Sequence, residues 1–175
     1  MTKRRLIIIA ALAALAALLA IPAVVMGDPT DITTVRGTIG ATYSLTSPDT
    51  ISLGNFESTN NYDSSNQNID AYTNDAQKNQ VTIVVSDSKT STRGFMTLNG
   101  NDQIPKLANA LSVKGGAVNT YSPLTSNQTL ASNQNLISGS YTINDFSVRQ
   151  TITSDDLSKT AGTYSITLTF TATFN

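Results

Sequence analysis

Apolar and polar residues alternate most regularly at the end of the chain, over residues 163–175 (TYSITLTFTATFN). From Tyr164 to Phe174 every second residue is apolar, and hydroxyl-bearing residues fill the positions between them. This period of two predicts a β-strand with one apolar and one polar face. The β-branched and aromatic residues favour the same interpretation. Such a strand needs a second apolar layer to cover it, and the rest of the chain is expected to supply that layer.

A second alternating stretch lies near the other end, over Thr33–Leu45. Val35, Ile39, Tyr43 and Leu45 fall on one face of it, with Gly37 and Ala41 between them. It is predicted to form one long strand or two short ones, because glycines weaken a strand interior.

Further strands are predicted in the middle of the chain. Asn79–Ser86 is expected to be central in its sheet, because Val84 makes it apolar on both faces. In Tyr141–Thr153 the apolar stripe shifts by one residue at Asn144-Asp145, which predicts a β-bulge. Two shorter strands are expected at Ile51–Phe56 and Gly94–Leu98.

Four segments lack a clear period. Residues 57–70 are predicted to be a loop and residues 120–138 a polar connection. In residues 154–162, a connection to the last strand, Leu157 is expected to be buried. Ile104–Val113 is compatible with a helical turn that starts at Pro105 and equally with a loop that leads into a strand.

Short strands separated by frequent turn signals predict an all-β fold. We expect an antiparallel two-sheet immunoglobulin-like sandwich, with a barrel as the alternative.

The first residues have the pattern of a secretory leader, which would form a signal helix ahead of this domain. Lys3, Arg4 and Arg5 precede an apolar run, and Pro22 interrupts it shortly before Gly27. Residues 1–27 are therefore predicted to be a signal peptide cleaved before Asp28, and residues 28–175 a single domain. An uncleaved membrane anchor is the alternative, because about 20 apolar residues suffice to span a bilayer.

Net charge and the absence of cysteine limit the partners and the crosslinks that can be expected. Without its leader the chain would keep 8 of its 11 basic residues against 12 acidic ones, a net charge near −4. Nucleic acids and anionic lipids are therefore not expected as partners, since both require basic patches. There is no cysteine in the 175 residues, so no disulfide supports the fold.

The chain offers little chemistry for catalysis. It has neither His nor Cys, which excludes Ser-His-Asp and Cys-His triads and most zinc sites. Asp155-Asp156 is best explained as a turn, and Glu57 is the only glutamate. We expect a protein that is not an enzyme and that uses no cofactor.

Three weaker candidate sites remain. Asp63, Asn66, Asn68 and Asp70 could offer oxygen ligands to calcium, as could Asn99, Asn101 and Asp102, although Asx-rich turns explain both groups. Asn127 begins the only Asn-x-Thr/Ser acceptor for a glycan. Lys106 and Lys114 lie near apolar residues and could form isopeptide bonds with Asn, but surface lysines with buried stems are the simpler interpretation.

The segments ISLGNF and TAGTYSITLTFTATFN resemble parts of secreted immunoglobulin-like surface proteins of bacteria and archaea. These include WxL-type cell-surface domains and sandwich subunits of extracellular filaments. The resemblance implies a sandwich fold and a cell-surface setting. The chain has no Trp, so the wall-binding Trp-x-Leu motif is missing and that activity is not implied.

Two functions follow as hypotheses. The first is a secreted structural protein that assembles with itself or with other cell-surface components, with Val35, Ile39, Tyr43 and Leu45 donated as a strand to a neighbour. The same segment would otherwise pair within its own sheet. The second is a monomeric adhesion or binding module for a carbohydrate or protein, for which Tyr62, Tyr72 and Tyr121 are the available loop aromatics.

Overall fold

The computed structural model describes residues 36–102 and 105–175. The predicted leader and Val35 lie outside the described residues. The chain divides into two units, Met1–Thr38 and Ile39–Asn175, and the fold below is that of the second unit.

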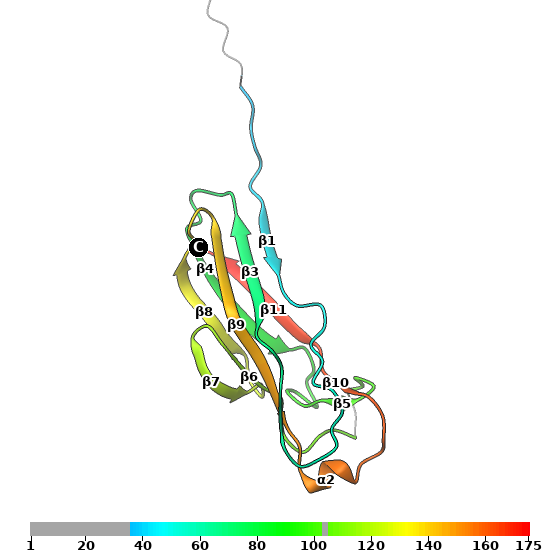
Figure 1. Ribbon diagram of the computed structural model, residues 1–175. Helices are drawn as coiled ribbons and strands as arrows, with labels where there is room; N and C mark the ends of the chain where they lie inside the picture. The colour runs from blue at the N-terminus through cyan, green and yellow to red at the C-terminus, as the bar shows by residue number, and fades with distance from the viewer. Residues whose placement is uncertain (1–35, 103–104) are drawn as a thin grey trace, which may run out of the picture. The chain divides into compact units, whose positions relative to one another are not determined.

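Antiparallel strands make up this unit (Figure 1). The strands are β1 (Tyr43–Thr46), β2 (Asn61–Asp63), β3 (Gln67–Thr73), β4 (Gln80–Asp87), β5 (Thr97–Leu98), β6 (Ser112–Gly115), β7 (Val118–Pro123), β8 (Gln128–Asn135), β9 (Ser140–Thr151), β10 (Tyr164–Ser165) and β11 (Leu168–Phe174). Among the described residues the only helix is α2, a single turn over Ser154–Leu157. The all-β prediction is therefore confirmed.

The strands form two main layers. One sheet has the order β1-β3-β9-β6-β7, with β2 also paired to β9, and the other has the order β11-β4-β8. The short pair β10-β5 lies apart from both sheets. In Figure 1 the layer of β4 and β11 lies behind β3 and β9. The core between the layers is aliphatic around one aromatic ring and includes Ile69, Val81, Ile83, Val113, Leu130 and Phe146.

Two details of the predicted strands are confirmed. β4 is central in its sheet, between β11 and β8. In β9, the partners Gln67↔Phe146 and Ile69↔Ile143 place two residues, Asn144 and Asp145, opposite one residue of β3. This is the predicted bulge, and it keeps both Ile143 and Phe146 buried.

Two segments predicted to lack structure contain strands. Residues 57–70 include β2 and the start of β3, and residues 120–138 include all of β8. These strands are polar because most of their residues are exposed. In β8 only Leu130 and Ala131 are buried. These segments are strands because they form hydrogen bonds with neighbouring strands, and not because their own apolar residues alternate.

Several shorter predictions are wrong. Ile51–Phe56 forms no strand, and Gly94–Leu98 pairs only at its last two residues. Of the two alternatives for Ile104–Val113, the loop that leads into a strand is confirmed, because residues 105–111 contain no helix and strand β6 begins at Ser112. Leu157 is 44% exposed, and its neighbour Asp156 is buried in its place.

Within residues 36–45, the described part of the predicted strand Thr33–Leu45, a strand forms only at the end. β1 begins at Tyr43, and Tyr43 and Leu45 pair with Thr73 and Ala71 of β3. Residues 36–42 have no regular secondary structure and are exposed. This alternating segment is therefore divided between a strand of its own sheet and an unpaired stretch.

Candidate functional site

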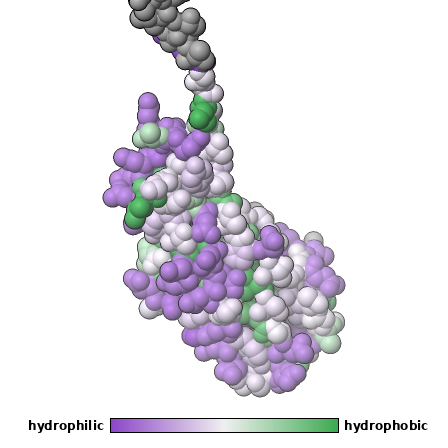
Figure 2. Space-filling model, turned by 45° about the horizontal axis from the view of Figure 1, so that its top comes forward, coloured by the Kyte–Doolittle hydropathy of each residue, from purple (hydrophilic) through white to green (hydrophobic). Residues whose placement is uncertain are grey.

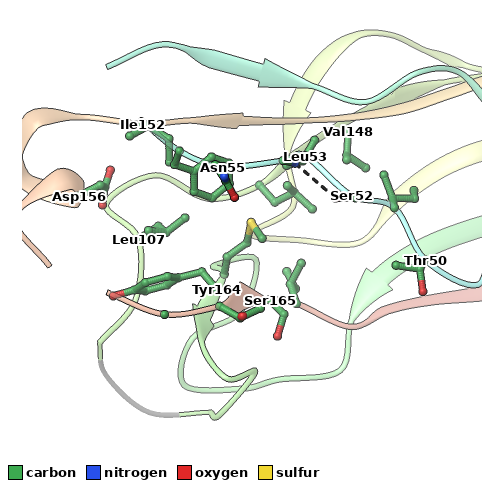
Figure 3. A pocket seen from close by; sticks show the side chains of 18 of the residues that line it. Thr50, Ser52, Leu53, Asn55, Leu107, Val148, Ile152, Asp156, Tyr164 and Ser165 are labelled. Carbon is green, nitrogen blue, oxygen red and sulfur yellow. Dashed lines mark hydrogen bonds between the residues drawn. The ribbon is translucent and has the colours of Figure 1, made fainter. Parts of the chain in front are cut away.

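The main concave feature is a groove of about 860 Å³ between the coil of residues 48–56 and the start of the terminal strands. Its lining includes Leu53 on the coil, Leu107 and Val148 from the interior, and Tyr164 and Phe170 from the last segment. Figure 3 shows side chains from these separate stretches converging on the same space. Within the described residues, no backbone hydrogen bond joins the coil to β10 or β11.

The groove continues onto an apolar row that the fold covers only in part. The inward-facing residues of β11 are all half-buried, and its threonines are exposed. The inward row is Leu168, Phe170, Ala172 and Phe174. Figure 2 shows that the visible surface is otherwise mostly hydrophilic or neutral, with apolar residues in narrow patches. An incompletely covered strand of this kind can accept a further chain segment.

Polar groups at the lower end of the groove are already paired with one another. Asp156 accepts hydrogen bonds from the Ala108 amide (2.7 Å), from Thr153 and from the Lys159 ammonium (2.8 Å). Burial opposes ionisation of this carboxyl, but these hydrogen bonds outweigh it and lower the pKa of Asp156. The cluster holds the corner between β9 and β10 and offers no free nucleophile or base.

The unpaired N-terminal stretch is held where it joins the fold. Asn74 accepts from the Thr42 amide (2.6 Å) and donates to the Gly40 carbonyl (3.1 Å). The Tyr43 hydroxyl donates to Asp75 (2.7 Å), a bond that raises the pKa of Tyr43 and lowers that of Asp75. Before this clamp, Ile39 is 89% exposed. Of the four predicted donor residues, Tyr43 and Leu45 thus lie in their own sheet, Ile39 is free of it, and Val35 lies outside the described residues.

Asn127 lies exposed in the turn between β7 and β8. Its side-chain oxygen accepts a hydrogen bond from Arg93. The predicted glycan acceptor therefore lies on the surface, with its side-chain oxygen engaged by Arg93.

The three acidic residues among the seven considered for calcium are engaged by other groups. Asp63 accepts two hydrogen bonds of 2.6 Å from Arg149, which lower the pKa of its carboxyl, and Asp70 accepts from Thr142. Asp102 accepts from the hydroxyl and amide of Thr92. Among the described residues no three acidic side chains gather into a cluster suited to a metal.

The remaining candidates also have partners. Lys106 lies 4.0 Å from the centre of the Phe95 ring, and Lys114 lies 6.0 Å from that of Tyr121. These are cation–π contacts. Tyr121 also stacks under Arg149, Tyr62 packs on Phe56, and only Tyr72 keeps an open ring, 41% exposed.

Comparison with known proteins adds no assignment. A scan against protein-family models found no match to this chain, and a search of curated proteins found no relative. Within the part of the chain that the structure describes, no helix is long and apolar enough to cross a bilayer. The function must therefore be argued from the geometry.

Sequence analysis predicted the alternating segment before Tyr43 but not the incomplete cover of β11. It expected the rest of the chain to supply a second apolar layer over this row, which contains two Phe and one Leu. Ile51–Phe56, expected to be a strand, is coil and makes no backbone hydrogen bond to β11 among the described residues.

Proposed function

We propose that this chain is a secreted, non-enzymatic structural protein of the cell surface, an immunoglobulin-like sandwich that assembles with copies of itself by strand addition. The observation that carries the proposal is the alternating stretch before Tyr43. Its described part, residues 36–42, pairs with no strand among the described residues, and Ile39 is 89% exposed.

An exposed β-branched aliphatic side chain in an alternating segment contributes no burial to its own fold but would gain it on assembly. Burying such a side chain contributes roughly 1.5–3 kcal/mol. Adding the segment to the edge of another sheet would supply this burial together with a row of main-chain hydrogen bonds. The basic and apolar leader and the low content of charged residues, 13%, support the secreted surface setting.

Deletion of residues 28–39 tests the proposal. The chain from Asp28 to Asn175 is expected to form filaments or a concentration-dependent series of oligomers, measured by light scattering after size exclusion and by electron microscopy. The deletion retains Gly40 and Thr42, which Asn74 holds, so the variant should stay folded and become monomeric. A matched full-length control replaces Val35 and Ile39 with Ser and should lose assembly equally.

Two results would contradict self-assembly by addition of this segment. The first is a chain that stays monomeric at every concentration. The second is assembly that persists unchanged in the deletion variant, because the segment would then not be its basis.

A binding module is the second candidate, and the groove beside residues 48–56 favours it. Its volume of about 860 Å³ lies within the ~300–1,000 Å³ typical of ligand sites. A glycan array and a pull-down of surface components, each with a Leu53→Asp variant as control, would test this alternative.

A further inference from the structure

The geometry points to the free edge of β11, with the adjoining groove, as the acceptor for residues 33–39 of a second copy of this chain. This inference rests on the proposed self-assembly and names the surface at which it occurs. Four independent features of the described residues lead to it.

The first feature is the direction of the backbone groups of β11. Asn175 and Gln80 exchange both main-chain hydrogen bonds, at 2.9 and 3.2 Å. In an antiparallel pair such residues alternate with residues whose amide and carbonyl point the other way. Counting back along the register, the main-chain groups that point away from β4 are those of Leu168, Phe170, Ala172 and Phe174. Within the described residues, none of these four makes a backbone hydrogen bond at the free edge.

The second feature is that the same four residues carry the half-buried apolar row. An added strand would therefore satisfy the open main-chain groups and extend the cover over this row in one step. The two other long edge strands, β7 and β8, do not combine open main-chain groups with an apolar row. β7 has no regular apolar row, and the second half of β8, Ser132–Asn135, is exposed and polar.

The third feature is the fit of the donor. Thr33, Val35, Gly37 and Ile39 occupy alternate positions over seven residues, and β11 also has seven residues. An ideal Cβ placed on Gly37 or Gly40 would meet nothing within 4 Å, so the chain's own fold gives no packing reason for either glycine. A glycine in a strand is typical of a place where another backbone approaches closely.

The fourth feature explains why a second copy is favoured over the same chain. Tyr43, where the segment joins the fold, packs on Phe174, the last residue of β11, with ring centres 5.3 Å apart. To lie along its own β11 the segment would have to reverse direction at this point. The bonds from Asn74 to Gly40 and Thr42, and from Tyr43 to Asp75, hold the backbone where that reversal would occur.

Disulfide trapping between two full chains tests the assignment, because the protein contains no cysteine of its own. One chain carries Thr38→Cys, and the other carries Thr169→Cys, Thr171→Cys or Thr173→Cys. These threonines are exposed and bond to β4, so toward an added strand they occupy the non-hydrogen-bonded positions. Such positions have the closest Cβ approach and suit a disulfide.

Matched controls use the other sheet edges. Thr38→Cys is mixed with Thr120→Cys on β7 or with Ser132→Cys on β8, both of which are exposed. We expect a dimer on non-reducing gels with at least one β11 position, lost on reduction, and none with either control. All variants should keep the far-ultraviolet spectrum of the unmodified chain, because each changed residue lies on the surface.

Residue-resolved hydrogen exchange gives a second readout without substitution. Assembly should slow exchange of the amides of Leu168, Phe170, Ala172 and Phe174, whereas those of Thr169, Thr171 and Thr173 are already bonded to β4 in the single chain. This alternating gain of protection is specific to an added strand and would not arise from general burial.

The outcomes separate the two proposals. Assembly with trapping only at β7 or β8, with no trapping, or with no new protection in β11 would overturn the acceptor site and leave self-assembly standing. A chain bearing Thr38→Cys and Thr171→Cys that closes an internal disulfide, while mixed chains give no dimer, would also overturn it. A chain that is monomeric at all concentrations would overturn both.

Discussion

β9 and β11 are both predicted from an apolar stripe, but the fold uses them differently. β9 pairs with strands on both sides and buries Ile143, Phe146 and Val148 almost completely. β11 pairs with β4 alone, and each of its apolar side chains stays half-buried. The strand with the more regular alternation is thus the less completely covered one.

The difference shows what periodicity encodes. Alternation reports which side chains share a face, but the number of hydrogen-bonded neighbours depends on the rest of the chain. β9 even contains a bulge at Asn144-Asp145, and its interior position tolerates it. A regular strand left at an edge is a surface to which another strand can add.

Truncating an aromatic ring on each strand is expected to give the largest contrast. Phe146 is fully buried, so Phe146→Ala should lower the free energy of unfolding by about 3–5 kcal/mol. Phe170, whose ring centre lies 5.2 Å from that of Phe146, is half-buried, and Phe170→Ala should cost about 1–2 kcal/mol. Urea denaturation of the monomeric chain followed by circular dichroism measures both. Equal losses would show that β11 is as well covered as β9.

Strands could be predicted from the sequence where large apolar residues recur at alternate positions and the fold buries them. β4 and the bulged β9 are examples, because their buried positions carry large aliphatic or aromatic side chains. β8 could not be predicted, since its last four residues are polar and exposed and its pairing with β4 depends on distant residues. Leu157 was expected inside, but the capping interactions of Asp156 with Thr153 turn the acidic side chain inward.

Only one part of the candidate site, the alternating segment, could be predicted from the sequence. The alternation at Val35 and Ile39 is visible in the sequence, and it identifies a segment able to add to a sheet. The acceptor could not be identified, because it depends on strand order and on the failure of Ile51–Phe56 to pair with β11.

The corner that leads from β9 toward β11 should show the next largest effect. Asp156→Ala removes the buried carboxylate that accepts from the Ala108 and Thr153 amides and should cost about 1–3 kcal/mol. The neighbouring Asp155 is exposed, and Asp155→Ala should change stability by no more than about 0.5 kcal/mol. Thermal or urea unfolding of the two variants makes the comparison.

Acid should weaken the same corner. The pKa of Asp156 is lower in the folded chain than its ordinary value of 3.8. Its contribution to stability is therefore fully present above that value and is lost as the pH falls through the folded pKa. The unmodified chain should lose stability more steeply with falling pH below about 4 than Asp156→Asn does. Parallel curves for the two proteins would show that Asp156 does not contribute in this way.

The outer face of β9 should tolerate change better than its inner face. Arg149 and Asp63 form an ion pair whose side chains are 32% and 40% exposed. Exposed pairs contribute about 0.2–1 kcal/mol, so Arg149→Ala should have an effect of this size, partly through its lost contact with Tyr121. Repeating the denaturation in high salt should reduce the difference between the two proteins, because salt screens exposed charges. A loss near that of Phe146→Ala would place the pair among the core interactions.

The smallest effect on the single chain is expected at Ile39, which the proposed assembly would bury. Ile39 is 89% exposed, so Ile39→Asp should change the monomer's free energy of unfolding by no more than about 0.5 kcal/mol. In the assembled state the same change would place a carboxylate against the apolar row of β11, where burying an unpaired charge is prohibitive. Light scattering should therefore show loss of assembly by Ile39→Asp and its retention by Thr38→Asp, whose side chain would face solvent on an added strand. If both variants assemble like the unmodified chain, the half-covered face of β11 is not completed by this segment, and its exposure needs another explanation.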